Sequence, residues 1–267
     1  MTAPVAAPVA APVTVDSKAP GIPWIRLVRI EMRKMVDTRA GFWLVLGIVI
    51  ISALVTAAML IWSDPRNLTF GQMFGMMNIP TGVLLPVLAI LLVTSERSQR
   101  TGLVTYTLEP RRSRVVSAKL ATSLVYAAAA VLVALAFGAI GTLLAGAFHG
   151  DIPNQWDMTW AGLRNSGMLQ LIALLEGFGF AMVIMNSAAA IVGFFALPTL
   201  WTIISNIVPW MHEHIEPWAS LNSAERPFQS GNTVAGEGWA HLGTAVAIWV
   251  LLPLLVGLWR LSRSEIK

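Results

Sequence analysis

The chain has 267 residues, of which 56% are hydrophobic and 12% are charged; its formal net charge is +4 and its mean hydropathy is +0.68. A soluble domain carries about a quarter charged residues, so this composition excludes a soluble globular protein and indicates a polytopic membrane protein. The chain has no cysteine, which excludes disulfide bonds, iron–sulfur centres and cysteine-ligated zinc sites.

Residues 1–20 form a low-complexity tail in which the unit Ala-Pro-Val recurs. Closely spaced prolines prevent a helix, so we expect an extended, polyproline-like segment. Such a tail is either dispensable or docks a partner protein.

Residues 21–41 predict an amphipathic helix before the first span. Its apolar residues recur at helical spacing: Trp24, Leu27, Val28, Met32, Met35 and Val36. Its basic residues lie mostly on the other side: Arg26, Arg29, Arg33 and Lys34. This division is typical of a helix that lies in the membrane surface and meets lipid headgroups with its basic face. The alternative is an ordinary basic flank of a spanning helix.

A helix needs about 20 apolar residues to cross a bilayer. Six segments meet this requirement: 42–62, 72–93, 120–148, 168–185, 188–208 and 239–259. The third is longer than a bilayer requires, and we expect it to tilt or to project beyond the membrane. The fourth and fifth are separated only by Asn186 and Ser187, where we predict a tight turn. The predicted fold is an all-α polytopic membrane protein with a six-span domain over 42–267.

The basic residues predict the orientation of these spans. Three of the 18 Lys and Arg residues fall in the loops on one side: Arg66, Arg164 and Arg226. The others fall in 1–41, 94–119 and 260–267, on the other side. Cytoplasmic segments carry the excess of basic residues, so we predict cytoplasmic termini, in the cytoplasmic (inner) membrane of a bacterium.

A charged loop, residues 95–119, separates the second and third spans. Its charged residues are Glu96, Arg97, Arg100, Glu109, Arg111, Arg112, Arg114 and Lys119. Proline disfavours a helical conformation in the residue before it and is favoured where a helix starts. Pro110 therefore predicts a break, followed by a helix that continues into the third span. A cytoplasmic element held at both ends by membrane helices can transmit a push from a soluble partner; the alternative is a basic loop that only sets the topology.

The sequence does not predict an enzyme. It contains no G-x-x-x-x-G-K-[ST] phosphate loop, no H-E-x-x-H motif and no segment outside the spans long enough for a nucleotide-binding domain. His212, Glu213 and His214 are the nearest metal-like cluster, but we expect no metal site there. They belong to the longest outside loop, 209–238, where we expect a re-entrant or interfacial helix that stops at Pro217 or slightly beyond. We assign no catalytic residue and no nucleic-acid partner.

Glu176 is the ionisable residue that lies well inside a predicted span. A charged group in mid-bilayer is costly and usually faces a cavity or a partner. Glu176 is therefore a candidate for a pore or dimer interface, where it could contact a cationic or polar substrate. The alternative is a protonated or paired carboxyl that serves only the structure of the bundle. The neighbouring Gly177 and Gly179 allow close helix packing.

Residues of the charged loop and its flanks follow an order that is known from one family: Glu96, Gly102, Thr105, Thr107, Pro110, Arg114 and Lys119. In these residues the chain resembles the membrane subunits of ABC-2 type transporters, the exporter-type permeases. The amphipathic helix, the six spans, the long last outside loop and the basic tail also occur in the same order. The resemblance covers about residues 22–267.

The resemblance implies a permease that exports a hydrophobic or amphipathic compound. It implies that ATP and Mg²⁺ are bound by two copies of a separate ATP-binding subunit, that this chain holds no cofactor, and that it pairs with a second copy or a homologous permease. The coupling region against the ATP-binding subunit would comprise Glu96, Arg97, Gly102, Thr105, Arg111, Arg112, Arg114 and Lys119. The connecting helix, residues 21–41, would contribute Arg29, Arg33 and Lys34.

Two other classes of function stay open at this point. One is an intramembrane enzyme, for which His149, Asp151 and Asp157 cluster near the outer edge of the spans. Such an enzyme would need a catalytic pair at one depth. The other is a scaffold or signalling subunit that transports nothing.

Overall fold

The computed structural model describes residues 22–98, 107, 109, 111–229 and 233–263, and these residues form helices and contain no strand. Six stretches within them are long and apolar enough to cross a membrane. They are α2 (Arg39–Trp62), α3 (Phe70–Ser98), α5 (Arg112–His149), α6 (Trp160–Ile184), α7 (Ser187–Ile207) and the continuous run of α11 (Gly236–Val246), η2 (Ala247–Leu251) and α12 (Leu252–Arg263). The predicted all-α polytopic architecture is confirmed.

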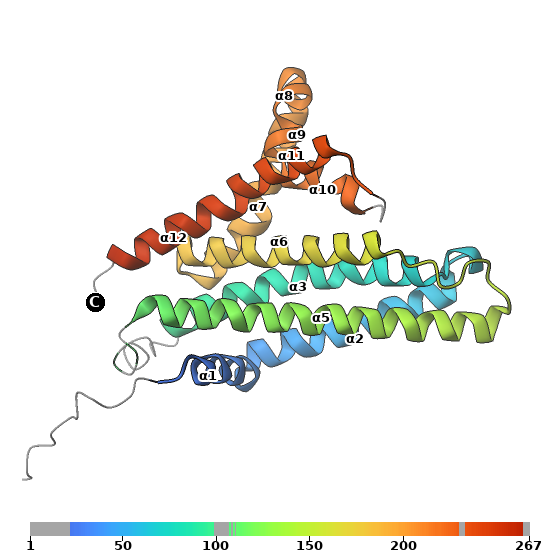
Figure 1. Ribbon diagram of the computed structural model, residues 1–267, viewed down its shortest axis with the longest axis horizontal. Coiled ribbons are helices and arrows are strands. Elements are labelled where there is room, and N and C mark those ends of the chain that lie inside the picture. The colour runs from blue at the N-terminus through green and yellow to red at the C-terminus, as the bar shows by residue number, and fades with distance from the viewer. Residues whose placement is uncertain (1–21, 99–106, 108, 110, 230–232, 264–267) are drawn as a thin grey trace, which may run out of the picture.

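Four of these helices, α2, α3, α5 and α6, run side by side along the long axis of the molecule (Figure 1). They share one apolar core, formed by Ile48, Leu85, Ala89, Ala127, Ala130, Leu174, Phe178 and Met182. The helix α3 is central, because it packs against the other three. Small residues let membrane helices approach closely. At Gly177 of α6 a β-carbon would lie 2.8 Å from the carbonyl oxygen of Pro86 in α3, so this approach requires glycine.

The helix α5 is 38 residues long, which corresponds to about 57 Å at 1.5 Å per residue. A bilayer core is about 30 Å thick, so α5 extends beyond it, as the length of the third predicted span indicated. The helix begins at Arg112, two residues after Pro110. The first turns of α5 therefore belong to the end of the bundle at which the charged loop lies.

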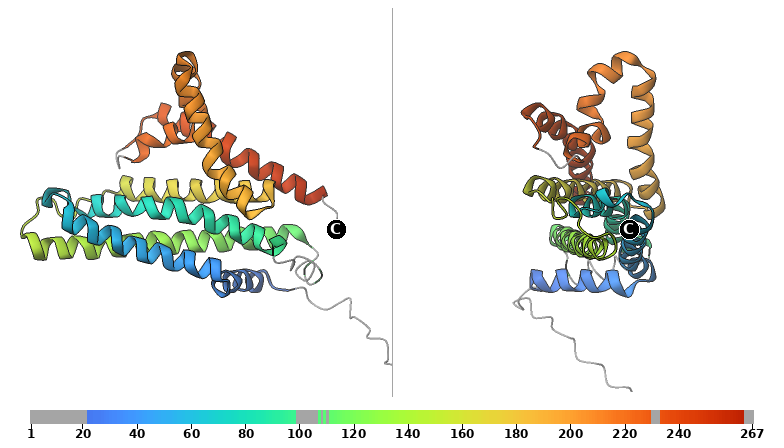
Figure 2. Two further views of the ribbon diagram at one scale, coloured as in Figure 1. Left: turned by 180° about the vertical axis from the view of Figure 1, so that it is seen from behind. Right: turned by 90° about the vertical axis from the view of Figure 1, so that its right-hand side faces the viewer.

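The predicted turn between the fourth and fifth spans is confirmed. Met185 ends α6 in the left-handed conformation, with φ 57°. Asn186 caps α7, because its Oδ1 accepts a hydrogen bond from the backbone N–H of Ala189 at 3.0 Å. The helix α7 then projects away from the bundle (Figure 2, right) and buries few of its side chains.

The loop 209–238 folds into three short helices before α11. They are α8 (Pro209–His214), α9 (Glu216–Ala219) and α10 (Leu221–Gln229). Pro217 lies in the first turn of α9 and does not end a helix, because the first N–H groups of a helix need no partner within it. The helix α10, which we did not predict, packs its Ala224 and Phe228 against α6 and α11. Asn165 of α6 donates to the Phe228 carbonyl at 3.2 Å, so α10 lies alongside the first half of α6.

The helix α1 (Trp24–Asp37) falls within the predicted amphipathic segment. It lies across the bundle, and is seen along its axis in Figure 1 and from the side in Figure 2 (right). Its buried face consists of Leu27, Val28, Glu31 and Met35. Trp24 and Val36, which we assigned to the apolar face, are exposed. The buried face of α1 therefore rests on the protein itself, and one of its four residues is charged.

Candidate functional site

Four charged side chains meet where α1, the end of α3 and the start of α5 come together. Lys119 Nζ lies 2.7 Å from Glu31 Oε2 and 3.5 Å from Glu96 Oε1. Lys34 Nζ lies 2.7 Å from Glu31 Oε1 and 3.0 Å from Glu96 Oε1. Each lysine therefore contacts both glutamates. We call Glu31, Lys34, Glu96 and Lys119 the charge network.

The charge network is balanced and largely buried. The side chains of Lys119, Glu31 and Glu96 are 4%, 5% and 8% exposed, and that of Lys34 is 39% exposed. Buried charges are tolerated when they are paired and hydrogen-bonded. The Lys119 ammonium satisfies this condition, since it also donates to the Leu92 carbonyl of α3 at 3.0 Å. Removing one member of the network would leave an uncompensated buried charge.

Lys34 forms the most exposed part of the charge network. Partial burial lowers the pKa of Lys34, but the hydrogen bond and charge of Glu31 and the charge and hydrogen bond of Glu96 raise it by more. The net effect is a pKa above the ordinary value of 10.5. Lys34 is therefore protonated at neutral pH and holds α1 to α3.

Neutral contacts add to the attachment of α1 to α5. Thr122 Oγ1 donates to the Val28 carbonyl at 3.3 Å, and the Tyr126 hydroxyl donates to the Met32 carbonyl at 2.9 Å. Ala118 packs against Val28 in the same contact region. A movement of α1 along α5 would break these bonds together with the ion pairs. The helices α1 and α5 are therefore held together at this end of the bundle by ion pairs, hydrogen bonds and apolar packing.

Two arginines of the predicted coupling region point to partners within the chain. Arg114 donates to Glu109 Oε2 at 2.9 Å and to the Ile22 carbonyl at 2.6 Å. Arg112 donates to the Leu261 carbonyl of α12 at 2.9 Å. These contacts bind the start of α5 to the segment before α1 and to the last helix. Both arginines therefore stabilise the assembly of this end, and they offer less to an external partner than their positions in the sequence indicated.

The structure divides the predicted coupling and connecting residues into three groups. Partners within the chain hold Lys34, Glu96, Arg112, Arg114 and Lys119. Exposed at the same end are Arg29, Arg33 and Arg111. Arg97 belongs to the last turn of α3, whereas Gly102, Thr105 and Pro110 lie outside the described residues.

Glu31 was not among the predicted site residues. It lies on the buried face of α1, between Val28 and Met35 at helical spacing. An acidic side chain on the apolar face of a basic amphipathic helix is unusual, because it must find a buried cation. That position was the signal that could have identified Glu31 before the structure was known.

Glu176, the predicted intramembrane residue, is enclosed by helices of its own chain. Its residue is 4% exposed, and its Oε1 atom has no hydrogen-bond partner among the described residues. The adjacent Gly177 packs on Pro86 of α3, and Gly179 packs on Pro253 of α12. The close packing that these glycines permit is therefore contact within the chain.

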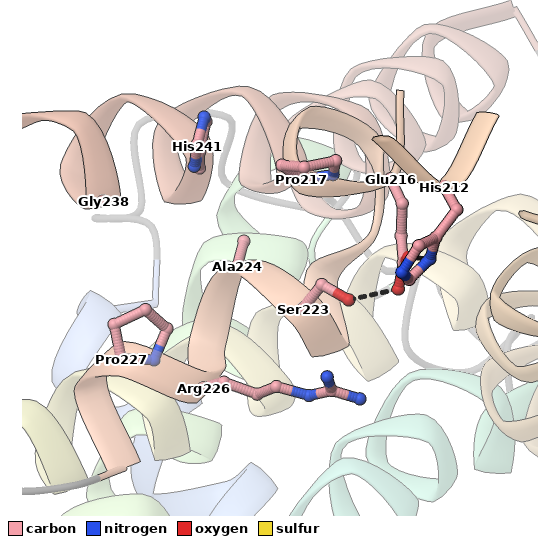
Figure 3. A pocket seen from close by; sticks show the side chains of 9 residues that line it. All are labelled: His212, Glu216, Pro217, Ser223, Ala224, Arg226, Pro227, Gly238 and His241. Atoms are coloured by element: carbon pink, nitrogen blue, oxygen red, sulfur yellow. Dashed lines mark hydrogen bonds and ion pairs between the residues drawn. The ribbon is translucent and has the colours of Figure 1, made fainter. Parts of the chain in front are cut away.

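An open pocket of about 240 Å³ lies among α8, α9, α10 and α11 (Figure 3). The Glu216 carboxylate in its wall accepts a hydrogen bond from the Ser223 hydroxyl and pairs with the ring of His212. In a serine nucleophile the imidazole must contact the hydroxyl and the carboxylate must lie behind the imidazole. Here the carboxylate lies between the other two groups. This order of groups does not activate the serine.

The acidic residues near this edge of the spans were considered as catalytic or metal-binding groups. Asp157 accepts hydrogen bonds from the Gly71 N–H at 2.7 Å and from the Thr69 hydroxyl at 2.9 Å, and so caps the start of α3. Across the part of the chain that the structure describes, no three His, Asp or Glu side chains are grouped so that they could hold a metal ion. Neither finding supports an intramembrane enzyme.

No family model and no curated protein matches this chain. Its function is therefore inferred from the geometry of the charge network and of the residues around Glu176.

Proposed function

We propose that this chain is the membrane subunit of an ATP-driven exporter of the ABC-2 type, and that the charge network passes movement from an ATP-binding subunit to the spans. The charge network is the observation that carries this proposal. It joins α1 to both ends of the charged loop, at Glu96 and Lys119. These are the two elements that the resemblance assigns to contact with the ATP-binding subunit.

The packing supports a path for this movement. Lys119 holds α1 through Glu31 and holds α3 through the Leu92 carbonyl, so a displacement of α1 also displaces α3. The central helix α3 contacts α6 closely at Pro86 and Gly177. Packed helices have a few discrete arrangements and do not deform continuously. A push at α1 would therefore select between two arrangements of the spans, one open to each side.

The ATPase in this proposal is a separate polypeptide, because the sequence contains no phosphate loop. The end of the bundle that carries the charge network also exposes Arg29, Arg33 and Arg111. Such cations can steer an acidic surface of a partner into position, with an effect on encounter rate and specificity. The distribution of basic residues favours a cytoplasmic position for this end, in a bacterial cytoplasmic membrane, where ATP is available.

The proposed cargo is a hydrophobic or amphipathic compound, and the proposed complex contains two ATP-binding subunits and a second permease. The helix α7 supports the pairing, because it stands away from the bundle and exposes Phe195, Leu200 and Ile204. Apolar side chains on this helix are available to lipid or to another membrane subunit.

Co-purification with a candidate ATP-binding subunit tests the proposal. The chain and the ATPase are expressed together, extracted in mild detergent and separated by size-exclusion chromatography. We expect the ATPase to elute with the wild-type chain and to be lost from Arg29→Glu/Arg111→Glu. This double variant changes exposed residues only, so the bundle should remain folded.

The matched control is Arg66→Glu/Arg226→Glu, which makes the same change in net charge at exposed positions in two of the three loops on the other side. We expect this variant to retain the ATPase. Equal retention by both variants would show that the basic end is not the docking surface, and failure of the wild-type chain to bind any ATPase would refute the exporter proposal.

A further inference from the structure

Among the described residues, Glu176 is the one ionisable residue with a buried side-chain oxygen that has no hydrogen-bond partner. The residue is 4% exposed, and Oε1 has no donor among the described residues. A carboxylate in an apolar, membrane-level site is strongly disfavoured unless a cation or a hydrogen-bond donor faces it. Oε1 of Glu176 can therefore accept a cation or a hydrogen-bond donor that the described residues do not supply.

A second carboxyl group, that of Glu225, comes close from α10. Ala224, the residue before Glu225, packs in the same apolar cluster as Ile172, which lies one helical turn before Glu176. This packing of α10 on α6 brings the two glutamates to the same contact between the helices. If both carboxyl groups are ionised, they repel each other in such surroundings, and a cation between them would convert the repulsion into attraction.

Two arginines of α6 and α10 have other partners or positions. Arg164 donates to Asn165 Oδ1 at 2.9 Å and lies over the ring of Trp239 at 5.4 Å. Arg226 lines the pocket among α8 to α11 (Figure 3). Neither guanidinium forms a described bond to Glu176 or Glu225.

An aromatic pair lies one helical turn from Glu176. Phe180 follows it by four residues in α6, and residues at this spacing are neighbours on one helix face. The ring of Phe180 stacks on that of Trp249, with 6.5 Å between the ring centroids. A buried carboxyl beside an aromatic pair offers charge to a cationic group and apolar contact to the rest of the same molecule.

We propose that Glu176 and Glu225 together bind the positively charged group of an amphipathic organic cation, whose apolar part lies toward Phe180 and Trp249. We favour a large organic cation over a small inorganic ion, because the cost of removing its diffuse charge from water is lower. The bound molecule lies between α6 and α10, so α10 must separate from α6 to admit it. Binding of the cation does not depend on the proposed export function. Only the statement that this cation is the cargo rests on that function.

Binding of rhodamine 6G, a fluorescent monovalent organic cation, tests the site. The purified chain is placed in nanodiscs of zwitterionic phosphatidylcholine, which do not attract cations, and binding is followed by fluorescence anisotropy. Nile red, a neutral apolar fluorophore, serves as the matched probe. We expect Glu176→Gln and Glu225→Gln each to weaken rhodamine 6G binding tenfold or more and to leave Nile red binding unchanged.

The control variant is Glu237→Gln, which removes a carboxylate at an exposed position of α11. It should bind both probes as the wild-type chain does. The site is refuted if the wild-type chain does not bind rhodamine 6G, or if both Gln variants bind it with wild-type affinity. If Glu176→Gln elutes as an aggregate, rhodamine 6G binding by Glu225→Gln alone decides whether the site exists.

This assay contains no ATPase, so its outcome is separate from that of the co-purification experiment. Loss of the ATPase with intact rhodamine 6G binding would refute the exporter and leave a cation-binding membrane protein. Retention of the ATPase without rhodamine 6G binding would leave the exporter and refute the site.

Discussion

The ammonium group of Lys119 lies 2.7 Å from Glu31 Oε2, although 88 residues separate the two in the chain. This contact joins a helix that lies across the bundle to the longest helix within it. Both side chains are almost completely buried, so neither charge can be solvated by water if the other is removed. The stability of this end of the molecule therefore depends on their pairing.

Neutralising one member of the pair should be more harmful than neutralising both. Lys119→Met leaves Glu31 and Glu96 with Lys34 alone, and loss of one partner of a buried pair costs about 3–5 kcal/mol. Glu31→Met/Lys119→Met removes one charge of each sign and leaves Lys34 paired with Glu96 at 3.0 Å. We expect the double variant to regain most of the lost stability, measured as thermal denaturation in detergent. A double variant as unstable as the sum of the two single variants would contradict the pairing.

The raised pKa of Lys34 predicts where its contribution to stability is lost. A lysine whose folded pKa exceeds its unfolded pKa stabilises the folded state fully below the unfolded value, which is 10.5. Its contribution declines as pH rises through the raised folded pKa. The difference in thermal midpoint between wild type and Lys34→Met should be constant from pH 7 to 9 and should narrow above about 10.5. If the difference in thermal midpoint already changes between pH 6 and 8, a group other than Lys34 causes the change.

The contact of Gly177 with Pro86 predicts a steric effect that depends on position. In Gly177→Ala the new β-carbon would lie 2.8 Å from the Pro86 carbonyl oxygen, and overpacking typically costs about 1–3 kcal/mol. Gly167→Ala, in the same helix, meets no atom within 4 Å and should be neutral or stabilising by up to about 1 kcal/mol. Thermal denaturation of the two variants measures the difference. Equal midpoints would show that α3 and α6 are not closely packed at Gly177.

The orientation can be tested directly, because a chain without cysteine accepts single reporter cysteines. Arg66→Cys and Arg111→Cys both place a thiol at an exposed position. In intact cells a membrane-impermeant maleimide should label Arg66→Cys and should label Arg111→Cys only after the membrane is permeabilised. The reverse labelling pattern would place the charge network outside the cell and would be incompatible with an intracellular ATPase.

The spans were predictable because their signals are local. Hydropathy and length define the spanning segments, which are α2, α3, α5, α6, α7 and the α11–α12 run. The turn between α6 and α7 is also a local feature, because the cap residues Met185 and Asn186 are adjacent in the sequence. The start of α5 near Pro110 was likewise predictable from the properties of proline. None of these features requires knowledge of which helices are neighbours.

The candidate site was predictable only in part, because its contacts join distant residues. Glu96 and Lys119 were recognised from their place in the charged loop, but their pairing with Glu31 depends on how α1 crosses the bundle. The inward contacts of Arg112 and Arg114 likewise depend on α12 and on Ile22, which no local pattern relates to the loop. The approach of Glu225 to Glu176 depends on α10, a helix that was not predicted.

ATP turnover by the reconstituted complex is the measurement that tests the central claim most directly. In the proposed function the charge network joins the ATP-binding subunit to the spans, so we compare wild type with the charge-balanced Glu31→Met/Lys119→Met. The variant keeps Arg29 and Arg111 and should still bind the ATPase, but stimulation of ATP hydrolysis by transported compound should fall at least tenfold. Wild-type stimulation in a variant that is folded and fully assembled would contradict the account, and would leave the charge network with a purely structural role.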